Sequence, residues 1–195
     1  MGSDGVARTP VSPMRQLCDR AKMGDESKIL LTDQSTPQQF LNLLVEKELF
    51  GDAIRLVAYL LPKREAIGWG CLCLRHTLAS QKGKPLPNVQ VAAERWVSAP
   101  NEENRWAAKE TADKEDPRTP SGLLAMAVFF AGYSLAPPNI QAVPPPDHVT
   151  SEMVAGAVFL AGVINEPEKA NEKYRVFMQK ASALMARMQQ APQQQ

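Results

Sequence analysis

Hydrophobic residues recur every three or four positions through most of the 195-residue chain, the spacing that places side chains on one face of an α-helix. The clearest such stripe comprises Leu49, Ala53, Leu56, Val57 and Leu60. A second stripe comprises Ile67, Cys71, Leu74 and Leu78. We find no convincing run that alternates between hydrophobic and polar residues, as strands with one buried face do. The pattern therefore predicts an all-α protein.

Prolines and capping residues mark where these helices begin. Thr36 is followed by Pro37 and then by Gln39, an arrangement that predicts a capping box at a helix start. Further starts are expected at Pro62, at Thr119-Pro120 and at Pro167. The signals predict a compact bundle of about seven or eight helices, and much of the high proline count of 16 is explained as helix punctuation.

The same pattern divides the chain into three parts. The helical signals occupy residues 36–188, which we interpret as a single all-α domain. Residues 1–35 are polar and contain several Gly and Pro, and they predict a mostly flexible N-terminal arm. Residues 189–195 are Gln-rich and predict a disordered tail. Within the domain, a proline-rich connector at residues 135–147 separates two of the predicted helices.

Two of the predicted helices resemble each other in sequence. Residues 119–132 read TPSGLLAMAVFFAG and residues 149–162 read VTSEMVAGAVFLAG, with seven of the fourteen positions identical. One interpretation is a two-copy helical repeat that binds an extended peptide. The other is a pair of similar core helices packed side by side. A solenoid needs at least three repeats, so the second interpretation is favoured.

Composition and charge exclude several classes of function. The chain has 22 basic and 21 acidic residues and only 6% aromatic residues, which argues against nucleic acid as a partner. The most apolar stretches, Leu123–Tyr133 and Met153–Ile164, fall short of the ~20 residues that cross a bilayer, so no membrane insertion is expected. The N-terminus lacks a signal-peptide core, and three cysteines fit no disulfide framework. We therefore expect a cytoplasmic protein.

Candidate chemistry in the sequence is sparse. No nucleotide-binding motif is present, and we expect neither a cofactor nor a metal. Cys71 and Cys73 point in different directions if they lie on a helix, so they cannot share one ion. An enzymatic alternative remains, a small hydrolase in which Cys73 or a carboxylate acts together with His76.

The most distinctive segment begins at Pro62 and contains Arg64, Glu65 and Trp69. One interpretation is a capped helix start with a core tryptophan, in which Arg64 pairs with an acid of a neighbouring helix. The other is a partner-binding patch, because Trp and Arg are favoured anchors of protein interfaces. Two interpretations also apply to a second group, Trp96, Arg105 and Trp106. These residues either pack in the core, which is favoured, or form a clasp between helices that serves as a contact surface.

Several segments resemble an uncharacterised bacterial domain family that carries an L-P-x-R-E-A-x-W-W-x-C motif. The matching segments are Leu61 to Ala66 with Trp69, Cys71 and Arg75; Trp96 with Pro100 to Glu103, Arg105 and Ala108; Gly132 to Pro138; and Val143 to Pro146 with Ala155 to Val158. Two positions depart from the family pattern, since Gly68 replaces the first Trp of the motif and Tyr133 replaces a Gly. A contact made by that first Trp is therefore in doubt here.

The resemblance implies no assigned activity, but it links the chain to proteobacterial type VI secretion loci. From it we expect a non-enzymatic cytoplasmic accessory or adaptor protein. Its partner would be another protein, such as a component of the secretion system. The candidate partner-binding residues are Pro62, Arg64, Glu65, Trp69, Trp96, Arg105 and Trp106. The hydrolase and the helical-repeat peptide-binding module remain the alternatives, and the oligomeric state stays open.

Overall fold

The computed structural model describes residues 12–79, 85–137 and 139–190, and in these residues the protein is all-helical, as predicted. The α-helices are α1 Pro13–Arg20, α2 Asp25–Leu30, α3 Pro37–Glu46, α4 Phe50–Leu60, α5 Lys63–Leu78, α6 Asn88–Ser98, α7 Glu102–Lys114, α8 Pro120–Phe130, α9 Val149–Val163 and α10 Ala170–Gln190. A short 3-10 helix, η1 Pro167–Lys169, precedes α10. The eight helices from α3 to α10 correspond to the predicted bundle.

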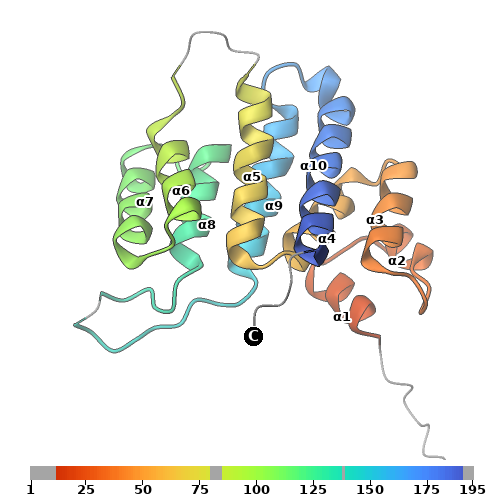
Figure 1. The fold of residues 1–195 in the computed structure, drawn as a ribbon, viewed down its shortest axis with the longest axis horizontal. Helices are drawn as coiled ribbons and strands as arrows, with labels where there is room; N and C mark the ends of the chain where they lie inside the picture. Colours follow the sequence, from red (N-terminus) through yellow and green to blue (C-terminus); the bar gives the residue numbers. More distant parts are fainter. Residues whose placement is uncertain (1–11, 80–84, 138, 191–195) are drawn as a thin grey trace, which may run out of the picture.

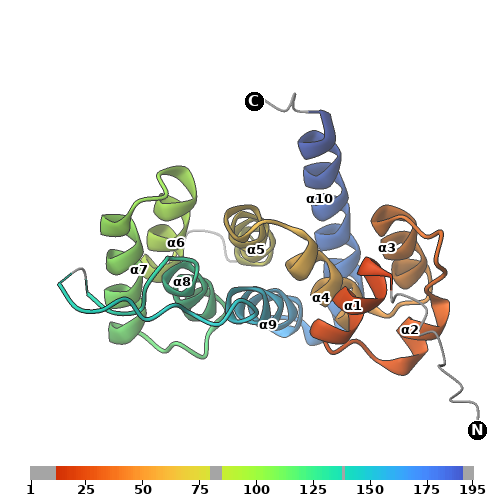
Figure 2. The same ribbon diagram turned by 90° about the horizontal axis from the view of Figure 1, so that it is seen from below.

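The helices from α5 to α10 alternate in direction, so that neighbours along the chain pack antiparallel (Figure 1). Seen from below, α5 and α9 occupy the middle of the molecule (Figure 2). The helices α6, α7 and α8 lie on one side of them, and α1 to α4 lie on the other (Figure 2). The middle position of α5 means that it contacts neighbours on opposite sides, including α6, α9 and α10.

Several helix starts follow the local sequence signals. The Thr36 hydroxyl accepts a hydrogen bond from Gln39 N, and the Gln39 side chain accepts one from Thr36 N, which completes the predicted capping box. Thr119 Oγ1 accepts a bond from Gly122 N at 3.0 Å at the start of α8. The start of α9 differs, since the helix begins at Val149 without a side-chain cap.

The N-terminal segment corrects the prediction of a mostly flexible arm, because residues 12–31 carry two helices that pack on the core. Leu17, Cys18 and Met23 are buried. Asp52 of α4 holds the segment in place by accepting bonds from Gly24 N at 2.9 Å and Ser27 Oγ at 2.6 Å. The polar composition concealed a short apolar face, and Ser12-Pro13 is a helix start of the same kind as Thr36-Pro37.

The remaining predictions for the termini fall mostly outside the described residues. Residues 1–11 and 191–195 are not described, so the flexibility expected there stays a prediction. Gln189 and Gln190, which were assigned to the disordered tail, belong to the last turn of α10.

The two helices that resemble each other in sequence, α8 and α9, form the most extensive helix–helix contact of the described fold. Ala125 and Val128 of α8 are fully buried, as are Val158 and Ala161 of α9. Small residues at such positions let two backbones approach closely, and burial of their neighbours stabilises the pair. This arrangement is the one expected for two similar core helices packed side by side.

The sequence similarity between α8 and α9 extends to their packing. The carbonyl of Phe129 accepts a hydrogen bond from Arg105 Nη1, and that of Phe159, thirty residues later, accepts one from Tyr174 Oη; both are 2.9 Å. Three residues after each Phe stands a glycine, where a Cβ atom would overlap with the incoming Arg105 or Tyr174 side chain. Burial raises the pKa of Tyr174 to about 12, so its hydroxyl stays protonated and able to donate.

No single helix among the described residues has both the length and the apolar character to span a membrane. The segments Val149–Val163 and Pro167–Gln190 meet the combined requirement of length and apolar character only as a pair, and that pair is bent by 115°. The apolar character of α9 has another explanation here, because much of the helix is buried against α8 and α5.

The close contact at Gly162 yields a first prediction. Gly162→Ala should lower the free energy of unfolding by about 1–3 kcal/mol, because the new methyl group displaces the Tyr174 ring from its place beside α9. Gly156→Ala in the same helix is the matched control, since its Cβ would lie an ordinary 3.5 Å from Leu123 Cδ1. That control should raise stability by up to about 1 kcal/mol through helix propensity. Urea unfolding measures both, and equal effects would contradict the packing assigned to Gly162.

Candidate functional site

A groove of about 540 Å³ lies along α5, between α6 and the C-terminal half of α10. We call it the α5 groove. Its apolar surface comes from Gly68, Trp69, Cys71, Leu72, Val97 and Leu184. Its polar residues are Arg64, Glu65, Arg75, Glu94 and Ser98. An apolar surface bordered by charged groups is the usual composition of a site that binds another polypeptide.

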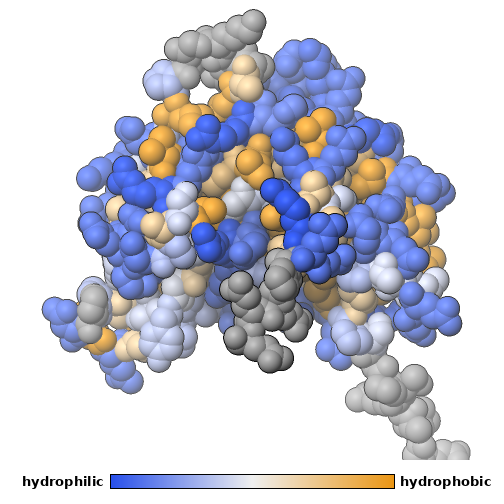
Figure 3. Space-filling model, in the orientation of Figure 1, coloured by the Kyte–Doolittle hydropathy of each residue, from blue (hydrophilic) through white to orange (hydrophobic). Residues whose placement is uncertain are grey.

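One face of α5 supplies most of this groove. Arg64, Gly68, Leu72 and Arg75 follow one another at intervals of four, four and three residues, so they line up along the helix. Leu72 is 42% exposed and adds an apolar side chain to the open side of the groove. Hydrophobic residues interrupt the hydrophilic surface on the face of the molecule that shows α5 (Figure 3).

Hydrogen bonds fix the charged groups that border the α5 groove. Arg64 Nε donates to the carbonyl of Val97 near the end of α6 at 2.8 Å. Arg75 makes a bidentate pair with Glu94 of α6, in which Nε donates to Oε1 at 2.5 Å and Nη2 donates to Oε2. Gln90 also donates to Glu94 Oε1, at 2.8 Å. The groove is therefore formed before any partner arrives.

Of the candidate partner-binding residues at the start of α5, some line the α5 groove and others do not. Arg64 and Glu65 line it, whereas exposed Pro62 stands at the entrance to α5 as its N-cap residue. Arg64 was expected to pair with an acidic side chain of a neighbouring helix. Among the described residues it bonds instead to the backbone carbonyl of Val97. The pair between α5 and an acid of α6 is made instead by Arg75, a residue that the sequence analysis named only in the resemblance.

Trp69 is a core residue rather than an exposed anchor. Its side chain is fully buried, and Nε1 donates to the carbonyl of Phe177 in α10 at 3.0 Å. The hydrogen bond satisfies the indole and ties α5 to α10. Trp69 therefore forms part of the groove's base, while Leu72, which sequence reasoning missed, offers the exposed apolar surface.

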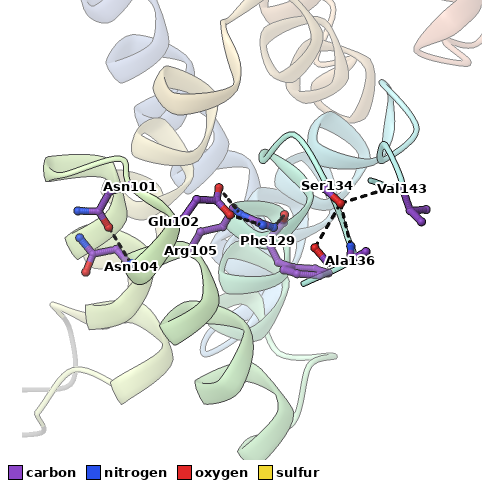
Figure 4. Close-up of polar contacts among 8 residues, drawn as sticks. All are labelled: Asn101, Glu102, Asn104, Arg105, Phe129, Ser134, Ala136 and Val143. Carbon is purple, nitrogen blue, oxygen red and sulfur yellow. Dashed lines mark hydrogen bonds and ion pairs between the residues drawn. The ribbon is translucent and has the colours of Figure 1, made fainter. Parts of the chain in front are cut away.

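Arg105 and Trp106, two of the other candidate partner-binding residues, do not line the α5 groove. They belong to α7, which packs against α8. Arg105 is 1% exposed, and its guanidinium binds Glu102 in a bidentate pair at 2.8 and 2.6 Å while also donating to the Phe129 carbonyl (Figure 4). Its guanidinium carbon lies 5.0 Å from the ring centroid of Trp106 and 5.1 Å from that of Phe129. We call this set the Arg105 clasp, and it differs from the clasp suggested by the sequence because Trp96 takes no part in these contacts. Trp96 is buried in α6, as core packing predicts.

Close to the Arg105 clasp, Ser134 closes the base of the connector between α8 and α9 (Figure 4). Its hydroxyl accepts bonds from Ala136 N at 3.0 Å and Val143 N at 3.1 Å. Leu135 N donates to the Val143 carbonyl at 2.8 Å. These bonds hold the two arms of the connector together, although the sequence alone indicated only a proline-rich linker.

Cys73 and His76, the two named residues of the hydrolase alternative, differ in their exposure. Cys73 is fully buried, and burial raises the pKa of its thiol well above the ordinary range. His76 is exposed, and its ring packs edge-on against Phe177 with centroids 6.1 Å apart. A neutral buried thiol is a weak nucleophile, which removes the support for Cys73. Within the described residues, no three His, Cys, Asp or Glu side chains gather closely enough to hold a metal ion.

The geometry thus describes a helical bundle with a preformed groove along α5 and a projecting loop that is closed by hydrogen bonds. The chain belongs to the "Family of unknown function (DUF6931)", whose model matches residues 40–185. The match confirms the resemblance to an uncharacterised domain family and spans the α5 groove, the Arg105 clasp and the connector. No curated protein and no solved structure shows significant similarity to the chain.

The buried position of Arg105 leads to a stability prediction. Arg105→Ala should lower the free energy of unfolding by about 2–4 kcal/mol, because it removes a charge-assisted network and leaves the Phe129 carbonyl without this donor. Arg118→Ala is the control, since that arginine is 89% exposed and pairs only at the surface. Chemical denaturation should show no measurable change for the control. A loss of similar size in both variants would contradict the role assigned to Arg105.

The pair with Arg105 also predicts a pH dependence. The hydrogen bond from Arg105 lowers the pKa of Glu102 in the folded protein. Its contribution to stability is therefore complete above the pKa of the unfolded chain, roughly 4.3, and is lost as the pH falls through the lower folded value. Glu102→Gln should be less stable than wild type at pH 7, by less than about 1 kcal/mol because Glu102 is 62% exposed. The difference should close below about pH 4 in denaturation curves, and a pH-independent difference would contradict it.

Proposed function

We propose that this protein is a non-enzymatic adaptor that binds a partner protein in the α5 groove. The observation that carries the proposal is the exposed Leu72 in the middle of a preformed apolar surface with charged borders. An amphipathic helix is the partner segment that such a surface fits, because it presents apolar residues in a row with polar residues on either side. The groove follows the length of α5 from Arg64 to Arg75, which suits a helix of several turns.

The charges around the groove add a preference for orientation. Arg64 uses Nε for the Val97 carbonyl, and no other hydrogen bond of its guanidinium is seen in the described part of the chain. The remaining N–H groups are available to a carboxylate of the incoming segment. Arg75 and Glu94 already neutralise each other at the other end. We therefore expect an acidic residue of the partner helix to lie at the Arg64 end.

The cellular setting of this adaptor rests on the sequence resemblance alone. The resemblance links the family to type VI secretion loci, and we propose that the partner is a component of that apparatus in the bacterial cytoplasm. The family match supports the uncharacterised family and leaves the setting as a proposal. A peptide-binding module of helical repeats is not needed to explain the similarity between α8 and α9, since the pair is accounted for by core packing.

The groove is tested by a charge placed on its exposed apolar surface. Leu72→Asp should reduce partner recovery by about tenfold or more, because the complex would bury an unpaired carboxylate. Val91→Asp is the matched control, since Val91 is 40% exposed on α6 and does not line the groove. Tagged full-length variants would be purified from the native host, with co-purifying proteins quantified by mass spectrometry and folding checked by circular dichroism.

The possible results separate the groove from its setting. Selective loss of one partner with Leu72→Asp supports the groove, and equal recovery by both variants contradicts it. If the partner that depends on Leu72 belongs to a secretion apparatus, the proposed setting is supported. If that partner belongs to another system, the setting is wrong although the groove stands.

A further inference from the structure

The connector between α8 and α9 projects from the end of the bundle at which α8 finishes and α9 begins (Figures 1 and 2). Three of the eight exposed large hydrophobic residues in the described chain lie between α8 and α9, namely Tyr133, Ile140 and Val143, which are 82%, 64% and 51% exposed. The sequence from Thr119 to Pro146 contains no Asp, Glu, Lys or Arg. A loop that carries no charge before Asp147 and exposes three large hydrophobic residues is typical of a contact surface.

The backbone conformation at the end of this loop follows from its prolines. Val143, Pro144 and Pro145 each precede a proline, which disfavours the helical region for them and favours an extended or polyproline II backbone. Each proline ring also fixes its own φ near −65°. The residues from Val143 to Pro146 lie in neither a helix nor a strand in the structure, which agrees with this preference. We call these four residues the proline tract.

A polyproline II helix has three residues per turn, so it presents three edges. Val143 and Pro146 share one edge, Pro144 lies on the second, and Pro145 lies on the third. The burial pattern agrees with this assignment, because Pro145 is half-buried whereas Val143, Pro144 and Pro146 are exposed. The proline tract therefore turns two apolar edges toward solvent.

The hydrogen bonds of the tract fix its ends and leave its middle open. The Val143 backbone bonds to Ser134 and Leu135, and the Pro146 carbonyl accepts a bond from Val149 N at 3.2 Å. The carbonyls of Pro144 and Pro145 accept no hydrogen bond from any described residue. A tract held in its bound shape loses less conformational entropy when a partner binds, and its free carbonyls are acceptors for that partner.

We propose that the proline tract is a ligand for a second partner, a domain whose groove is lined by aromatic side chains and carries indole or phenol donors. Proline-rich segments in this conformation dock into such grooves, where the rings pack against the proline edges. A charged groove does not fit, because the tract and the loop before it carry no charge. A basic or acidic membrane surface is disfavoured for the same reason. This surface is separate from the α5 groove, so the bundle presents two binding sites.

The test uses the full chain and a panel of purified SH3, WW and EVH1 domains, with the fluorescence of a tryptophan in each domain's groove as the readout. Wild type should bind at least one domain saturably. The double variant Pro144→Ala/Pro146→Ala should weaken that binding by about tenfold or more, because both exposed edges lose a proline ring. Pro137→Ala, an exposed proline in the other arm of the loop, should bind as wild type does.

The proposal is overturned if no domain of the panel binds wild type, or if the double variant binds as tightly as wild type. It is also overturned if Pro137→Ala weakens binding equally, or if sedimentation shows that the tract mediates self-association instead. Leu72→Asp should leave this binding unchanged, which distinguishes a failure of the tract from a failure of the α5 groove.

Discussion

The fold depends on buried side-chain donors that are satisfied by backbone carbonyl groups of neighbouring helices. Arg105 donates to the Phe129 carbonyl across Gly132, and Tyr174 donates to the Phe159 carbonyl across Gly162. Trp69 does the same for Phe177. Polar groups that are buried without a partner are costly, so each of these bonds fixes how two helices meet. The glycines matter because only a residue without Cβ lets the donor come close enough.

Both candidate binding surfaces follow from these internal bonds. The bond from Trp69 to Phe177 holds α10 against α5 and thereby places Leu184 at the edge of the α5 groove. The Arg105 clasp fixes the end of α8, and Ser134 then closes the loop that begins there. The surfaces are thus extensions of the core, and a partner meets groups that are already positioned. Such preorganisation reduces the conformational cost of binding.

The sequence predicted the helices well and the surfaces poorly, for a physical reason. Local signals such as Thr36-Pro37 are read from adjacent residues, so the starts of α3 and α8 followed directly from them. Trp69 lies off the stripe formed by Ile67, Cys71 and Leu74, and its burial depends on α10, which is about a hundred residues away in the chain. Periodicity alone cannot show that a second helix covers that face. Periodicity is equally unable to show that no helix covers Leu72, so its exposure was missed.

The segment before α3 was mispredicted because its average composition is polar. Leu17, Cys18 and Met23 form a small apolar face in a stretch whose average composition is polar, and Asp52 of α4 supplies the bonds that hold it. A composition average hides three well-placed residues, and only the neighbouring helix reveals what they pack against. Among the candidate site residues, Arg64 and Glu65 line the same groove, and Trp69 is buried, as the interpretation of a core tryptophan predicted.

The central claim is that the exposed face of α5 is where a partner protein binds, and site-specific photo-crosslinking in the native host tests it most directly. A photoreactive amino acid in place of Leu72 should yield a covalent adduct with one defined partner, within an amphipathic helical segment of that protein. The same amino acid in place of Val91, which has similar exposure outside the groove, should yield no such adduct. Identical adducts from both positions, or none from position 72, would contradict the account.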